Sequence, residues 1–159
     1  MPTPDRTPTS VRNYRFGFSP LGFVAVMIPM IPNIVWALLP GASEALAANH
    51  SPWAAVDVVG TVAQSLMIAL LILLVATRRQ LTAGKKIFRA VAATCLAAYL
   101  LLWLLYFTAD LAPLAILMMA VLPATYFICV AVYLENYPAL IPAALFTLIH
   151  VATTASNFL

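Results

Sequence analysis

The residues in this sequence that are able to do chemistry are polar side chains set within long apolar stretches. Asp57, Thr61, Gln64 and Ser65 stand at helical spacing in one such stretch, so they fall on one face of a helix. A carboxylate there can hold a ligand or a proton, and it can equally face water near the end of the stretch. Gln64 lies deeper, where a glutamine serves either as packing glue between helices or as a ligand contact.

His150 is the second such feature, because a lone histidine within an apolar stretch is uncommon. Thr147, Thr154 and Asn157 share its helical face. An imidazole near a carboxylate such as Asp57 can bind a cation, move a proton or hold a polar headgroup. The sequence does not say whether the two stretches touch, so a functional and a structural role for His150 both stay open.

Asn33 and Tyr106 complete the set of polar candidates. Asn33 follows Pro29 and Pro32, whose missing amide hydrogens leave helical carbonyls that a side-chain amide can satisfy. Tyr106 belongs to an aromatic helical face that ends at Asp110. This pattern favours packing and an aromatic belt at a membrane surface over a binding site.

The composition indicates a membrane protein. Hydrophobic residues make up 64% of the 159 residues and charged residues 8%, against about 45–50% and 25% in soluble domains. A chain of this length has too small an interior to bury so many apolar side chains, so a bilayer must solvate them. The net charge of +3 lies in clusters that flank apolar stretches, which indicates the lipid bilayer and no nucleic acid as partner.

Each apolar stretch is long enough, at about 20 residues, to cross a bilayer as a helix. We predict an all-α integral membrane bundle over residues 19–159, preceded at 1–18 by a disordered tail and an interfacial anchor. Gly60, in the second span, permits close approach of a neighbouring helix. The five transmembrane helices are expected at residues 20–39, 53–77, 87–109, 113–134 and 138–155.

Charge then orients the spans. Five alternating spans place all eight Lys and Arg on the side of the N-terminus and of the link at 78–86. The positive-inside rule makes that side cytoplasmic, with the N-terminus in and the C-terminus out of a bacterial plasma membrane. The polar candidates then map to the outer half of the bilayer or its edge, which suggests a small outward pocket. The candidate ligand-binding residues are Asn33, Asp57, Gln64, Tyr106, His150 and Asn157.

No motif in the sequence indicates catalysis. The patterns of metalloproteases, serine hydrolases and phosphate-binding loops are missing, as is the Cys/His spacing of a zinc site. Cys95 and Cys129 each lie in an apolar span, where cysteine behaves as a small buried side chain. We therefore expect no cofactor, no metal and no catalytic residue.

The segments GFVAVMIPMIPNIVW (22–36) and YPALIPAALFTLIHV (137–151), with short loops between the spans, resemble the uncharacterised small multi-span membrane proteins of Gram-positive bacteria. The resemblance implies a membrane bundle and no particular activity.

Three functions fit these observations. The first is a polytopic membrane protein that binds or moves a small ligand, an ion or a lipid headgroup in the outward pocket. The second is an accessory subunit whose polar faces mate with another membrane protein or with a second copy. The third, and least favoured, is an intramembrane lipid-modifying enzyme.

Overall fold

The computed structural model describes residues 13–39, 44–77, 82–109 and 111–159. The predicted tail at 1–10, two arginines of the 78–86 link and Asp110 lie outside these ranges. Within them the chain is mainly helical, and five helices are long and apolar enough to cross a membrane, as the sequence predicted. They are α1 (Pro20–Leu38), α3 (Ala54–Leu73), α4 (Ala83–Thr108), α5 (Pro113–Tyr133) and α6 (Leu140–Phe158).

Local signals set several helix ends. Ser19 caps α1 by accepting a 3.0 Å hydrogen bond from the amide of Gly22, and Pro20 and Pro113 occupy first helical positions, where proline costs no hydrogen bond. Glu135 ends α5 with a φ of 57°. The amide of Asn136 then reaches back to the carbonyl of Ala131 at 2.9 Å, which is the Schellman arrangement of a helix C-terminus.

The second span is shorter than predicted. Helix α3 stops at Leu73, and the strand β2 (Leu74–Ala76) pairs antiparallel with β1 (Tyr14–Phe16). Hydropathy treats residues 74–77 as more helix because an apolar run looks the same in either conformation. The expectation of a purely helical fold is therefore corrected by one short ladder, which gives the backbone before α1 its hydrogen-bond partners.

Two links also differ from the prediction. Helix α4 begins at Ala83, so Lys85 and Lys86 belong to its first turns and not to a loop. The first link, predicted as a loop, contains the short helix α2 (Glu44–Ala47). A 3₁₀ turn, η2 (Tyr137–Ala139), leads into α6.

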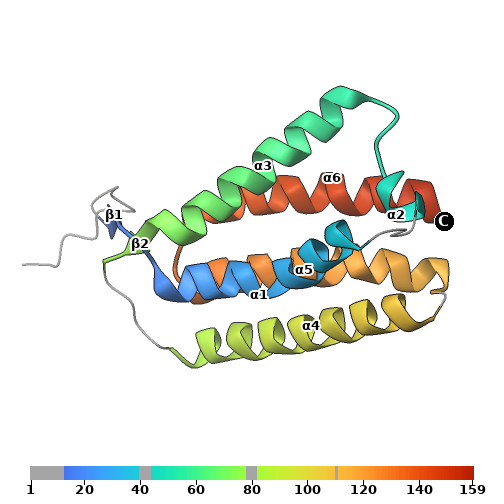
Figure 1. Ribbon diagram of the computed structural model, residues 1–159. Coiled ribbons are helices and arrows are strands. Elements are labelled where there is room, and N and C mark those ends of the chain that lie inside the picture. Colours follow the sequence, from blue (N-terminus) through green and yellow to red (C-terminus); the bar gives the residue numbers. More distant parts are fainter. Residues whose placement is uncertain (1–12, 40–43, 78–81, 110) are drawn as a thin grey trace, which may run out of the picture.

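Helix α5 is the most buried of the five spans and lies between α4 and α6 (Figure 1). Helix α3 packs on α6, so the spans that carry Gln64 and His150 do touch. A Cβ atom at Gly60 would lie 3.1 Å from Cγ2 of Ile149, which confirms close approach at that glycine. The main core cluster draws residues from all five spans, the largest number from α5, and includes the fully buried Met67 and Leu71 of α3.

Helices α1 and α3 meet closely near the end that carries the β ladder. A Cβ atom at Gly22 would lie only 2.0 Å from the carbonyl oxygen of Leu71, so the two backbones are in direct contact there. Toward the end that carries α2 and the C-terminus, the two helices diverge (Figure 1). This wedge leaves room between α1 and the α3–α6 pair.

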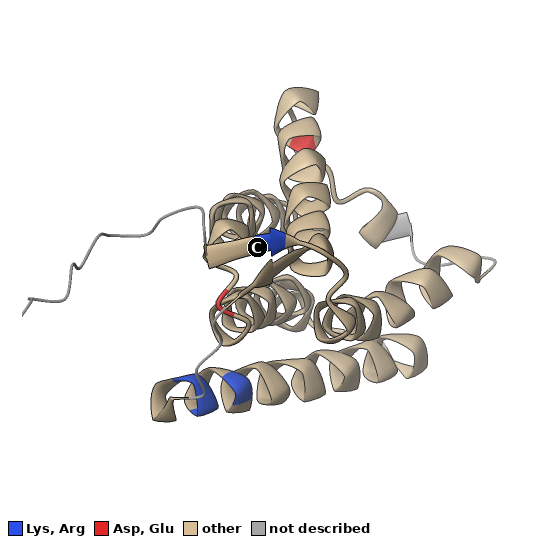
Figure 2. Ribbon diagram, turned by 90° about the vertical axis from the view of Figure 1, so that its left-hand side faces the viewer, with Lys and Arg blue, Asp and Glu red and all other residues tan. Residues whose placement is uncertain are grey.

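The two ends of the bundle differ in charge. Arg15 on β1 and Lys85, Lys86 and Arg89 on α4 lie at the end of the ladder, and they are all the Lys and Arg of the described ranges (Figure 2). Glu135 lies at the same end, paired with Lys85. Asp57 lies in the first turn of α3, which begins at the opposite end of the bundle (Figure 1).

Candidate functional site

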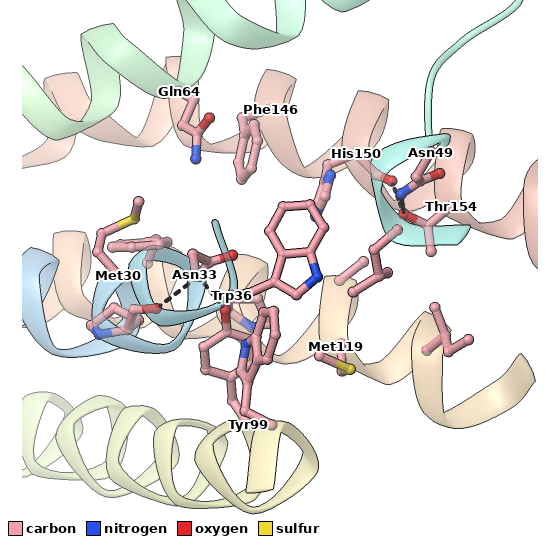
Figure 3. Close-up of a pocket in the computed structure, with 17 residues that line it drawn as sticks. Met30, Asn33, Trp36, Asn49, Gln64, Tyr99, Met119, Phe146, His150 and Thr154 are labelled. Atoms are coloured by element: carbon pink, nitrogen blue, oxygen red, sulfur yellow. Dashed lines mark hydrogen bonds between the residues drawn. The ribbon is translucent and has the colours of Figure 1, made fainter. Parts of the chain in front are cut away.

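A cavity of about 230 Å³ lies within the wedge. Helices α1, α3, α4, α5 and α6 all contribute to its wall, and Leu46 and Asn49 from the α2 link close one side. The wall combines aromatic and polar side chains (Figure 3). The polar ones are Asn33, Asn49, Gln64, Tyr99, His150 and Thr154.

Three of the predicted site residues, Asn33, Gln64 and His150, line this cavity. They come from α1, α3 and α6, far apart in the sequence. Figure 3 shows Gln64 reaching from α3, and His150 from α6, into the space around Trp36.

Asn33 is fully engaged as a donor. Its Nδ2 donates to the carbonyl of Pro29 at 3.0 Å and to the hydroxyl of Tyr99 on α4 at 2.8 Å. The expected role is different, because Pro29 and Pro32 leave open the carbonyls of Ala25 and Ile28, four residues earlier. Asn33 instead bonds to a carbonyl of its own helix and ties α1 to α4.

Gln64 and His150 have no such partners. Within the described chain neither side chain makes a hydrogen bond to protein. The His150 ring stacks on Phe146, with centroids 5.0 Å apart and planes 12° apart. Both residues are half-buried, and their polar groups are free to contact a molecule within the cavity.

Asp57 and Asn157 lie outside the cavity and hold the link that covers it. Asp57 accepts a 3.0 Å hydrogen bond from the amide of Ser51, and its carboxylate lies 3.7 Å from Nδ1 of His50. Asn157 donates to Oδ1 of Asn49 at 2.8 Å and to the carbonyl of His50 at 3.0 Å. The structure thus brings Asp57 to His50 and Ser51, whereas the His150 ring packs on Phe146.

Tyr106 also lies outside the cavity wall. It packs edge-on against Trp103, with ring centroids 5.3 Å apart. Its hydroxyl is buried and has no hydrogen-bond partner within the described ranges.

Sequence reasoning left several cavity residues out of the candidate set. Tyr99 lies two turns from Tyr106 on the same helical face, and Thr154 one turn from His150, so spacing was a usable signal for both. Trp36 stands one turn from Asn33. Asn49 carried no signal, because its link was expected to lie outside the bilayer; it donates to Oγ1 of Thr154 at 3.0 Å.

The cavity wall carries no Lys, Arg, Asp or Glu among the residues described. The described residues also contain no cluster of three or more His, Cys, Asp or Glu able to hold a metal ion. Such a site offers amide, imidazole, indole and hydroxyl groups for hydrogen bonding.

No family model, curated protein or solved structure matches this chain.

Proposed function

We propose that this chain is a multi-pass plasma membrane protein that binds a small uncharged molecule in the cavity between α1, α3 and α6. The observation that carries the proposal is the pair of unpartnered polar side chains, Gln64 and His150, on the cavity wall. Polar groups within a bilayer are costly to leave unpaired and commonly mark a functional site. The surrounding aromatic side chains supply the apolar surface that small-molecule sites share.

The volume favours a compact ligand. Pockets for drug-sized molecules measure about 300–1,000 Å³, and this cavity has about 230 Å³. One or two fused rings fill such a space.

The proposal includes an orientation. The described cations, Arg15, Lys85, Lys86 and Arg89, gather at the end of the β ladder. By the positive-inside rule this end faces the cytoplasm of a bacterium, with the N-terminus in and the C-terminus out. The link around Asn49 then faces outward, and a ligand reaches the cavity from the outer side.

Thermal unfolding of the purified protein tests the proposal, with three probes of one shape: 2-naphthalenemethanol, 2-naphthylmethylamine and 2-naphthoate. A ligand that binds only the folded state raises the unfolding temperature. We expect the uncharged alcohol to do so and the charged amine and acid to have little effect, because the described wall residues include no Lys, Arg, Asp or Glu to compensate a charge.

A cavity-filling variant supplies the control. Ala120 lines the cavity and is 2% exposed, so Ala120→Trp should abolish the effect of the alcohol. Ala152, on the outer surface of α6, gives the matched Ala152→Trp variant, which should keep it. Equal stabilisation by all three probes, or an unchanged response in Ala120→Trp, would refute the proposal.

A second candidate, an accessory subunit, is favoured by a separate feature. An apolar groove runs along α5 and α6, lined in part by Ala152 and Ala155. The hydroxyls of Thr125 and Thr147 in this groove bond to carbonyls of their own helices, so the surface stays apolar. Small side chains let a partner helix approach closely. Crosslinking in membranes from Leu148→Cys, also in this groove, would return a second protein or a second copy if this candidate holds.

A further inference from the structure

We infer that the ligand of this cavity is a flat, uncharged ring that bears hydrogen-bond acceptor oxygens, as the carbonyls of a quinone do. The inference rests on the proposed function and specifies its ligand class.

The cavity wall includes a hydrogen-bond donor without a partner in the described chain. The indole Nε1 of Trp36 is buried and has no hydrogen-bond partner within the described ranges. An indole N–H can only donate, so a ligand group that is only a donor cannot satisfy it. A ligand that satisfies Trp36 must bring an acceptor.

The side-chain amides of the wall also favour a ligand with acceptor oxygens. The Nδ2 of Asn33 already donates to Pro29 and Tyr99. The amide of Gln64 makes no hydrogen bond within the described chain and projects into the cavity (Figure 3). Gln64 and Trp36 reach the space from different helices, α3 and α1. Two donors on separate walls suit a ring with acceptor oxygens on different edges.

The wall also presents several flat aromatic side chains to the cavity. The rings of Phe146 and His150 are nearly parallel, at 12°, and Trp36, Trp103 and Phe127 complete an aromatic lining. Aromatic side chains pack best on other flat rings in offset or edge-on contact. A flat ligand gains this contact, whereas a branched aliphatic molecule of the same volume does not.

The absence of charged side chains from the described wall favours an uncharged ligand. A carboxylate or phosphate would also accept hydrogen bonds, but the wall holds no Lys or Arg, among the residues described, to offset its charge. Carbonyl oxygens on an uncharged ring supply acceptors without that penalty.

The test compares two ligands of one shape, 2,3-dimethyl-1,4-naphthoquinone and 2,3-dimethylnaphthalene. The methyl groups block addition of the Cys95 and Cys129 thiols to the quinone ring. Equilibrium dialysis measures binding to the full chain in nanodiscs, with empty nanodiscs as the baseline for partition into lipid. We expect the quinone to bind at least fivefold tighter than the hydrocarbon, because one hydrogen bond gives about a fivefold to tenfold effect and the wall offers two donors.

Trp36→Phe keeps a ring and removes one of the two donors, so the preference for the quinone should fall by about fivefold. Trp53 is 73% exposed and lies outside the cavity, so Trp53→Phe is the matched control and should keep the full preference. The comparison of ligands on the unmodified chain does not depend on either variant folding.

The outcomes separate the two proposals. Equal binding of both ligands overturns the acceptor inference and leaves the proposed function standing. An unchanged preference in a folded Trp36→Phe variant also overturns the assignment to Trp36. Failure of both ligands to bind above empty nanodiscs removes the proposed function and this inference together.

Discussion

The hydroxyl of Tyr126 donates a 2.7 Å hydrogen bond to the carbonyl of Ala25. In an unbroken helix that carbonyl would accept from the amide four residues later, and Pro29 has no amide hydrogen. A side chain on α5 therefore fills the place that a proline leaves open in α1. The contact fastens the two helices beside the cavity, which Pro29 lines.

Replacing Tyr126 by Phe should lower the free energy of unfolding by about 1–3 kcal/mol, because it leaves a carbonyl without a partner inside the bundle. Thermal unfolding in detergent measures the change. In a Pro29→Ala background the helix regains its own donor, so Tyr126→Phe should cost less there. Equal costs in the two backgrounds would show that the hydroxyl does not replace the missing amide.

Asn136 joins the end of α3 to the start of α6. It is 1% exposed, and its Nδ2 donates to the carbonyls of Leu70 and Leu74 at 2.7 and 2.9 Å. These carbonyls lie where α3 gives way to β2. Asn136→Ala should destabilise the protein by about 1–3 kcal/mol and raise amide hydrogen exchange at residues 74–77.

The control for this prediction lies at the other end of the molecule. Asn157→Ala removes a side chain that also makes two hydrogen bonds, but it should leave exchange at residues 74–77 unchanged. If both variants raised exchange equally, the effect would be global and not a property of Asn136.

Glu135 combines an ion pair with a strained backbone. It pairs with Lys85 while its φ is 57°, a conformation that costs a residue with a side chain about 1–2 kcal/mol. Both side chains are only 14% exposed. Glu135→Gln keeps the strain and removes the negative charge that pairs with Lys85, so it should lower stability by about 1–3 kcal/mol.

Glu135→Gly breaks the same pair but removes the strain, so we expect it to be about 1 kcal/mol more stable than Glu135→Gln. Chemical or thermal unfolding of the two variants under one condition gives the comparison. A glycine variant less stable than the glutamine variant would mean that packing of the side chain at position 135 outweighs the backbone term.

The link over the cavity is held by polar side chains at its outer end. Asn157 contacts both Asn49 and His50, and Asn49 and Leu46 line the cavity. Asn157→Ala should loosen this cover, so a maleimide should label Leu46→Cys several-fold faster in that background. Ser156 is exposed on the same turn, and Ser156→Ala should leave the labelling rate unchanged.

The sequence was sufficient to predict features that depend on composition and failed for those that depend on packing. Hydropathy located the five spans because about 20 apolar residues are needed to cross lipid. It extended the second span past Leu73, since strand and helix share the same apolar run there. Only three of the six candidate residues line the cavity. Helical spacing predicts which residues share a face of a helix, but it does not predict which face lies toward the interior of the bundle.

The position of the link that covers the cavity could not be predicted from the sequence for a similar reason. Asn49 owes its position to Thr154 and Asn157, which are more than one hundred residues away in the chain. No local pattern marks such a contact. The packing of α3 on α6 likewise depends on complementary surfaces, of which Gly60 was the single visible sign.

The proposed orientation predicts which positions a reagent outside the cell can label. In a background of Cys95→Ala and Cys129→Ala, a cysteine at Ser156 should react with a membrane-impermeant maleimide added to intact cells. A cysteine at Gly84, near the start of α4, should react only after the cells are opened, and that position has room for a side chain because a Cβ atom there would meet nothing within 4 Å. The reverse labelling pattern would place the cationic end outside, contrary to the positive-inside rule, and would turn the covered mouth of the cavity toward the cytoplasm.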